Sequence, residues 1–295
     1  MAPSAALVTR RAALAGIGAV AIAGAAPVRA DIVASFSVLA DMARAVAPER
    51  LAVAALAGAG IDPHGFEPRP GDARALAGAR LAIVNGLGFD DWAVRFARAA
   101  GFSGEVLVAT RDVRPLVGPG RASRPDPHAW LDVANARLYA RAIATAIQRA
   151  WPAAAPETTA RALSYDAALA ALDGEIRALL ASVPRARRTI VTAHESFAYF
   201  GRAYGLNVLA LNSASGEAAA ARTASVIRAV RASGAAAAFP EQALDARGLA
   251  TLQAETGVRL GGRLYADTLS GATGAATTYI ALMRTNARTI AAALT

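Results

Sequence analysis

The chain has 295 residues, with 31 basic and 22 acidic side chains, a formal charge of +9 and no cysteine. The lack of cysteine excludes a disulfide framework, a thiolate nucleophile and a cysteine-bound metal. All basic residues are arginine and they are scattered, without the basic runs and interleaved aromatic residues of a nucleic-acid groove, so no nucleic-acid partner is expected.

The first 30 residues have the pattern of an export signal. Arg10 and Arg11 precede an apolar run over residues 12–26, and residues 28–30 form a small-x-small cleavage site. Because the run is shorter than the ~20 residues that span a bilayer, we expect cleavage rather than a retained anchor. The arginine pair also resembles a twin-arginine signal, and both this route and the general secretory route are open. No cysteine follows that could carry a lipid, so the mature protein is expected to be free in the periplasm.

Apolar segments alternate with helical patterns in the first half of the chain. Residues 32–35 and 81–84 are apolar enough for buried strands, residues 51–56 form a further apolar run, and apolar side chains at helical spacing cover residues 38–46. Such alternation is typical of parallel sheets covered by helices. The polar, proline-rich residues 115–127 are expected to form a loop.

The most regular helical pattern lies between Pro156 and Pro184. Its apolar side chains recur at helical spacing and are Leu169, Leu172, Ile176, Leu179 and Leu180. Pro156 and Glu157 suit a first turn, and Pro184 suits the end. A helix of this length would span ~40 Å between two halves of similar pattern, so we expect a rigid connector.

The second half repeats the alternation of strands and helices. Strands are expected over residues 190–192, 208–211, 235–239 and 258–264, and helices over residues 196–204, 218–231, 244–256 and 277–294. The chain is long enough for two α/β domains with mostly parallel sheets and separate cores. The expected organisation is a signal peptide over residues 1–30, an N-terminal lobe over 31–153, a connecting helix over 154–184 and a C-terminal lobe over 185–295.

Histidine occurs three times in the chain, at His64, His128 and His194. His64 and His128 each end an Asp-Pro-His tripeptide, and His194 follows the strand expected over residues 190–192. A lone histidine is more often a partly buried polar residue than a ligand. The repeated tripeptide favours a shared metal site, because neutral imidazole is a preferred ligand of zinc and its neighbours. Ligands of open parallel sheets bind beyond the carboxyl ends of strands, where His64, His194 and Asp267 are expected.

Several motifs resemble one family in order and spacing over nearly all of residues 31–295. They are Asp62-Pro63-His64-Gly65-Phe66-Glu67-Pro68, Val84-Asn85-Gly86-Leu87-Gly88, Asp126-Pro127-His128-Ala129-Trp130-Leu131-Asp132, Thr192-Ala193-His194-Glu195-Ser196-Phe197, Phe239-Pro240-Glu241-Gln242 and the Asp267 segment. The family is that of the periplasmic zinc- and manganese-binding proteins of bacterial ABC importers, and the resemblance is to its zinc branch.

The resemblance implies two α/β lobes joined by one long helix, with a metal ion in the cleft between them. It assigns the ligands His64 and His128 to the N-terminal lobe and the ligands His194 and Asp267 to the C-terminal lobe. Histidine as the third ligand is the pattern of zinc-binding members, whereas manganese-binding members tend to have glutamate there. Three imidazoles and a carboxylate also suit four-coordinate zinc better than manganese, which is the alternative.

The function implied is capture of zinc in the periplasm and delivery to an ABC permease at the inner membrane, by a monomer, with a periplasmic metallochaperone as a further partner. A zinc hydrolase with an open three-histidine site is a more distant alternative, and surface adhesion a third. Asp267 as a fourth ligand would close the site and disfavours catalysis. Glu195 and Glu241 could orient the imidazoles or interact with helix N-termini, and both roles are open.

Overall fold

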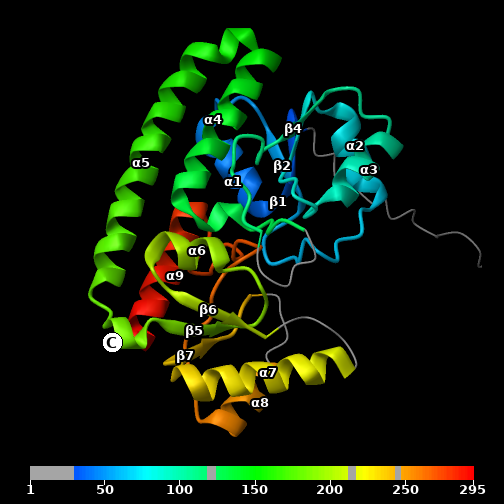
Figure 1. Cartoon of the computed structure of the whole chain (residues 1–295). Helices are drawn as coiled ribbons and strands as arrows, with labels where there is room; N and C mark the ends of the chain where they lie inside the picture. The colour runs from blue at the N-terminus through cyan, green and yellow to red at the C-terminus, as the bar shows by residue number, and fades with distance from the viewer. Residues whose placement is uncertain (1–29, 118–123, 212–216, 243–246) are drawn as a thin grey trace, which may run out of the picture.

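Two parallel β-sheets of four strands each form the centre of the molecule (Figure 1). The structure is a computed structural model of the chain, and it describes residues 30–117, 124–211, 217–242 and 247–295. The strand order is β2-β1-β3-β4 in the first sheet and β6-β5-β7-β8 in the second, so the two sheets have the same topology. This arrangement confirms the two-lobed α/β fold that the sequence predicts.

The elements around the first sheet are called the N-terminal lobe. In chain order they are β1 (Ile32–Phe36), α1 (Ser37–Val46), β2 (Val53–Ala57), α2 (Pro70–Gly78), β3 (Leu81–Val84), α3 (Asp91–Ala99), β4 (Glu105–Val108), η1 (Ala129–Leu131) and α4 (Val133–Ala150). The short turn η2 (Pro152–Ala154) leads into the long helix α5 (Ala155–Ala181).

The elements around the second sheet are called the C-terminal lobe. They are η3 (Arg185–Arg187), β5 (Thr189–Thr192), α6 (Ala198–Tyr204), β6 (Asn207–Ala210), α7 (Glu217–Ser233), β7 (Ala237–Phe239), α8 (Arg247–Thr256), β8 (Arg259–Leu260) and α9 (Tyr279–Leu294). Both lobes therefore alternate strands and helices, as parallel pairing requires.

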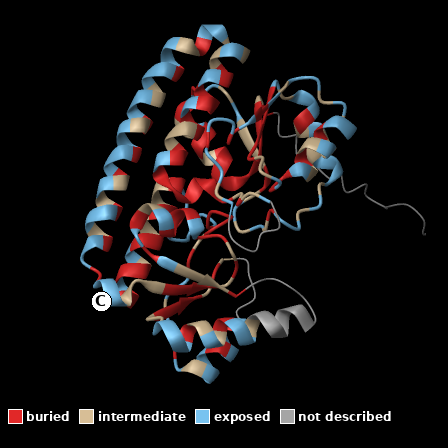
Figure 2. Ribbon diagram, viewed as in Figure 1, coloured by how far each residue is buried: buried red, intermediate tan, exposed pale blue. Residues whose placement is uncertain are grey.

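The central strands read as continuous apolar runs because helices cover both faces of each sheet. In β1, Ile32 and Ala34 pack into the large core with α1 and α4, whereas Val33 points to a smaller core with α2 and α3. In β5, Ile190 joins the large core and Val191 a third cluster beneath α7 and α8. Burial is accordingly concentrated on the strands and on the inner faces of the helices (Figure 2).

Helix α5 runs along one side of the molecule past both lobes (Figure 1). It packs against α1 and α4 of the N-terminal lobe and against α6 and α9 of the C-terminal lobe. Its buried residues form one face, at Thr158, Tyr165, Leu169, Leu172, Ile176 and Leu180. The large core extends through this packing into both lobes, from Phe36 and Trp130 to Tyr199 and Tyr279. The lobes thus share one apolar interior beside a single straight connector.

Two expectations about individual elements differ from the structure. The strand expected over residues 258–264 is only Arg259–Leu260, followed by an isolated bridge between Leu264 and Glu241. The 18-residue helix α4 was not expected at all. Residues 1–29 of the expected signal, residues 118–123 of the expected loop and residues 244–246 of an expected helix lie outside the described residues.

Within the described part of the chain, none of the helices is long and apolar enough to cross a membrane.

We expect Asn286→Ala to lower the free energy of unfolding by about 2 kcal/mol, because the fully buried Asn286 amide bonds both backbone groups of Tyr265, at 2.9 and 2.7 Å. Alanine would leave the Tyr265 N–H and C=O without these partners. Urea unfolding measures the loss. The matched control is Asn207→Ala at an exposed position at the start of β6, for which a change within about 0.5 kcal/mol is expected. Equal losses in the two variants would contradict the assignment.

Candidate metal centre

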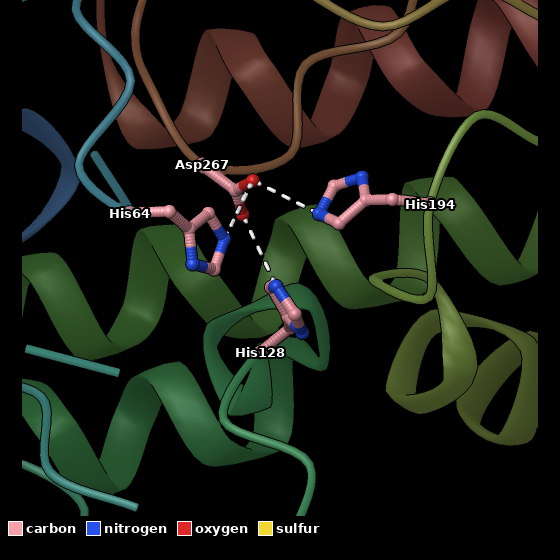
Figure 3. A group of neighbouring side chains, drawn as sticks. All are labelled: His64, His128, His194 and Asp267. Carbon is pink, nitrogen blue, oxygen red and sulfur yellow. Dashed lines mark ion pairs between the residues drawn. The ribbon is translucent and has the colours of Figure 1, made fainter. Parts of the chain in front are cut away.

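Four side chains from distant parts of the sequence converge between the lobes: His64, His128, His194 and Asp267 (Figure 3). Each offers one ligand atom, and these four atoms all lie within 4.8 Å of one another. The Asp267 carboxylate is central to the group. Its oxygens lie 3.4 Å from His64 Nε2, 3.4 Å from His128 Nε2 and 3.0 Å from His194 Nε2. The structure therefore brings together all four residues singled out in the sequence.

The two Asp-Pro-His tripeptides share a local structure. Asp62 Oδ1 accepts the N–H of His64 at 2.9 Å, and Asp126 Oδ1 accepts the N–H of His128 at 3.0 Å. In this turn an aspartate side chain bonds the backbone two residues later. The repeat in the sequence therefore reflects one turn used twice, which holds the backbone of each histidine as it enters the site.

Buried carboxylates lie behind two of the three imidazoles. Asp126 Oδ1 lies 2.7 Å from His128 Nδ1, and Glu241 Oε2 lies 3.0 Å from His194 Nδ1. A carboxylate at Nδ1 fixes the ring orientation and leaves Nε2 as the ligand atom. Glu241 also accepts the His194 N–H and the Ser196 hydroxyl, each at 3.0 Å. Glu241, one of the two glutamates whose role the sequence left open, therefore pairs with the His194 imidazole and holds its backbone.

The backbone around Asp267 is bonded to the N-terminal lobe, although Asp267 lies late in the chain. Trp130 Nε1 donates to the Ala266 carbonyl at 2.9 Å, and Ser37 Oγ accepts the Leu269 N–H at 3.0 Å. The N–H of Gly60 points to both the Leu269 carbonyl and Thr268 Oγ1, each at 2.9 Å.

The same segment is also bonded to the C-terminal lobe, where the resemblance places Asp267. Tyr265, two residues before Asp267, bonds Asn286 of α9 through both of its backbone groups. His194 lies at the end of β5 in the second sheet. Asp267 thus lies on a segment attached to both lobes, between His64 and His128 on one side and His194 on the other.

The centre is closed on one side by aromatic rings and reaches solvent at His64. Phe89 lies edge-on to the His64 ring at a centroid distance of 4.7 Å, and Trp130 to the His128 ring at 5.3 Å. The His64 side chain is 40% exposed, whereas that of Asp267 is 8% exposed. An apolar wall lowers the local dielectric and strengthens any interaction of the buried ligands with a cation.

Several of the buried ligand atoms lack a hydrogen bond of acceptable geometry within the described part of the chain. These atoms are Nε2 of His128, Nε2 of His194 and Oδ1 of Asp267. Buried polar atoms are almost always satisfied, because an unpaired one costs the full desolvation of the group. Three such atoms that face one point fit a cation bound between them.

The electrostatics of the group also favour a positive charge at its centre. Burial by itself would raise the pKa of Asp267, but the neighbouring His128 and His194 outweigh it and hold that pKa well below its usual range. Burial would lower the pKa of His194, but Asp267 and Glu241 outweigh it and raise the pKa to about 11. The pKa of His64 is likewise raised by Asp267 against the effect of burial. Without a metal ion, a proton on the His194 imidazole offsets the charge of the Asp267 carboxylate.

Three imidazole nitrogens and one carboxylate oxygen form a donor set for a single divalent ion. Catalytic zinc sites keep one position of the metal open for a bound water. Four protein ligands would fill a tetrahedral shell and leave no such position. Two α/β lobes with such a donor set between them are the architecture of metal-binding proteins of the substrate-binding class.

The comparison with known proteins gives the family. Residues 32–293 match the sequence profile of ZnuA, the periplasmic zinc-uptake complex component A, and the chain belongs to this family of periplasmic metal-binding proteins of ABC importers. The expected family membership is thus confirmed.

Relatives in this family carry names with different metals. The manganese-binding lipoprotein MntA of Halalkalibacterium halodurans is 32% identical over 267 residues, 89% of this chain and 88% of MntA. The iron-binding protein YfeA of Yersinia pestis is 29% identical over 88% of this chain and 85% of YfeA. The structure of the periplasmic zinc-binding protein TroA of Treponema pallidum superposes with a TM-score of 0.83 at 28% identity, covering 90% of this chain and 99% of TroA.

Zinc binding near neutral pH is expected to release at least one proton, because His194 with its pKa of about 11 is protonated in the metal-free protein and must lose the proton to coordinate. Raised imidazole pKa values stabilise the metal-free fold below pH 6.5, and that stabilisation is lost as the pH rises through the raised values. The stabilisation by zinc should therefore grow with pH.

Titration calorimetry in buffers of different ionisation enthalpy counts the protons. No proton release, together with equal melting shifts by zinc at pH ~5.5 and ~8, would contradict imidazole coordination.

Proposed function

We propose that this protein captures Zn²⁺ in the periplasm and delivers it to the permease of an ABC importer. The ligands proposed are His64, His128, His194 and Asp267. The observation that carries the proposal is the convergence of their four donor atoms within 4.8 Å, with three of the side chains buried. Zinc is the transported substrate here and not a resident cofactor.

Zinc rather than manganese or iron is proposed from the ligand chemistry of this chain. Zinc prefers four-coordinate sites with nitrogen donors, whereas manganese prefers more oxygen ligands. The centre supplies three imidazoles and only one inner carboxylate, because Asp126 and Glu241 are placed behind the histidines at Nδ1. The names of the relatives, which include manganese, iron and zinc binders, do not decide between these metals.

Transport without catalysis follows from the same donor set. A fourth protein ligand occupies the position that a hydrolytic zinc site keeps for water. Partial exposure of His64 gives the ion one route between the site and solvent. We further propose that the protein acts as a monomer without a lipid anchor, since the chain has no cysteine to carry one, and that it receives zinc from solution or from a periplasmic metallochaperone.

The metal content of protein purified from the periplasm without added metal tests the proposal. One equivalent of zinc per chain is expected. Competition titrations with a chromogenic chelator then compare zinc, manganese and ferrous iron. A higher affinity for manganese than for zinc would contradict the choice of metal, and no metal affinity at all would contradict the site.

Mutation of a residue that supports a metal ligand typically weakens metal binding by ~10–100-fold. His194→Ala should weaken zinc binding by more than this, because it removes one of the four proposed ligands themselves. Asp267→Ala should cost less, since water can enter the fourth position and the variant also loses the charge that raises the pKa of His194. Chelator competition measures both affinities. The matched control is Asp112→Ala at an exposed aspartate, which should bind like the wild type. Unchanged affinity in a His64→Ala/His194→Ala double variant would contradict the ligand set.

A further inference from the structure

Tyr199 lies on the short helix α6 that follows the His194 segment, and its side chain is fully buried. Its hydroxyl makes two hydrogen bonds that cross from the C-terminal lobe to the N-terminal lobe. It accepts the N–H of Leu116 at 2.9 Å and donates to the carbonyl of Asp126 at 3.1 Å. One side-chain oxygen therefore bonds two backbone groups of the other lobe.

Both backbone groups belong to the segment that delivers His128. Leu116 and Asp126 lie on either side of the loop and bond each other, with Asp126 N donating to Leu116 O at 2.7 Å. The side chain of the same Asp126 holds the His128 N–H and lies 2.7 Å from His128 Nδ1. The Tyr199 hydroxyl thus bonds the backbone carbonyl of Asp126, the same residue whose carboxylate orients the proposed ligand His128.

The other end of this connection is the His194 segment. Ser196 and the His194 N–H share the Glu241 carboxylate, and Tyr199 follows three residues later. Arg202, one turn further along α6, adds a second attachment: its guanidinium donates to Asp132 at 3.2 Å and lies over the Tyr199 ring. This ion pair is half-exposed at Arg202 and is therefore the weaker of the two attachments.

These contacts bear on where His194 lies relative to the other proposed ligands. His64 and His128 belong to the N-terminal lobe and the Asp267 segment is bonded to it, so the position of His194 relative to them depends on what joins its segment to that lobe. One link is the ion pair of His194 with Asp267. A second link, further along the chain, is the buried hydroxyl of Tyr199.

We propose that Tyr199 is a positioning residue for metal retention: its hydroxyl holds the His194 segment against the His128 loop and so slows the departure of the ion. The inference rests on the proposed function, since it assigns Tyr199 a role in that site. Phenylalanine keeps the ring but leaves Leu116 N–H and Asp126 C=O without this partner. The segment that carries His194 then moves away more often, and the metal leaves more often.

Two other buried tyrosines provide matched controls. The Tyr139 hydroxyl donates at 2.6 Å to Asn85, whose amide in turn donates to the Pro127 carbonyl at 3.0 Å, so it supports the His128 loop from within the N-terminal lobe. The Tyr165 hydroxyl on α5 is buried without a hydrogen-bond partner in the described part of the chain. Tyr139→Phe therefore tests loop support without a cross-lobe bond, and Tyr165→Phe tests the loss of a buried hydroxyl alone.

Stopped-flow transfer of zinc to an excess of chelator measures the dissociation rate of each variant. Tyr199→Phe should release zinc on the order of tenfold faster than wild type, in the range expected for groups that support metal ligands. Tyr165→Phe should release zinc at the wild-type rate. Tyr139→Phe should increase the dissociation rate less than Tyr199→Phe does. A purely structural role would lower the melting temperatures of the metal-free and zinc-bound proteins equally and leave the release rate unchanged.

A double-mutant cycle separates action through His194 from a general loosening. In the His194→Ala background, Tyr199→Phe should add no further acceleration, because the ligand that the hydroxyl positions is gone. The same tenfold acceleration in that background would overturn the proposal, as would a wild-type release rate in folded Tyr199→Phe.

Hydrogen exchange of the wild-type protein provides a test that needs no variant. The Leu116 N–H should exchange more slowly with zinc bound than without it, because closure of the His194 segment keeps its bond to Tyr199 formed. Equal exchange in the two states would overturn the inference. Failure of the wild type to bind zinc would instead contradict the proposed function, so the two failures are distinguishable.

Discussion

A buried carboxylate, Asp267, lies within 3.4 Å of three imidazole nitrogens, and its negative charge has to be balanced at that point. Protons on the imidazoles can balance it, and so can a divalent ion that displaces them. Either way of balancing the charge keeps the same four side chains together. The low dielectric behind Phe89 and Trp130 increases the strength of either arrangement.

The fold creates this convergence with short loops rather than with regular elements. Parallel strands in two similar sheets send loops from their carboxyl ends into the space between the lobes, the usual place for ligands in open α/β sheets. The backbone N–H of each histidine is then held by a carboxylate: those of His64 and His128 by aspartates two residues earlier, and that of His194 by Glu241, which follows the neighbouring strand β7. The loops are thereby held at the three histidines whose imidazoles enter the site.

The packing between the lobes bears on how a metal could leave. Helix α5 and one continuous core join the lobes, so wide hinge opening would have to expose much apolar surface. The Asp267 segment is bonded to the N-terminal lobe through Trp130 and Ser37 and to α9 through Asn286. A local shift of the His194 segment would instead break one of the four proposed ligand bonds and open the cross-lobe bonds of α6.

The sequence by itself determined the features that depend on local pattern. The strands near residues 32–35, 81–84 and 190–192 were predictable because burial on both faces demands uninterrupted apolar runs, and α5 because leucines recur along one of its faces. Helix α4 was not predicted, although Tyr139, Ile143 and Ile147 recur at helical spacing on its buried face. The three histidines stood out through their repeated turn.

Only the tertiary structure decided that the Asp267 segment is bonded to the N-terminal lobe as well as to α9, that Glu241 pairs with the His194 imidazole, and that Tyr199 bridges the lobes. These contacts join residues separated by 21 to 232 positions, and no local spacing encodes them. They form because folding brings the loops of two sheets to one place, where buried polar groups must find partners.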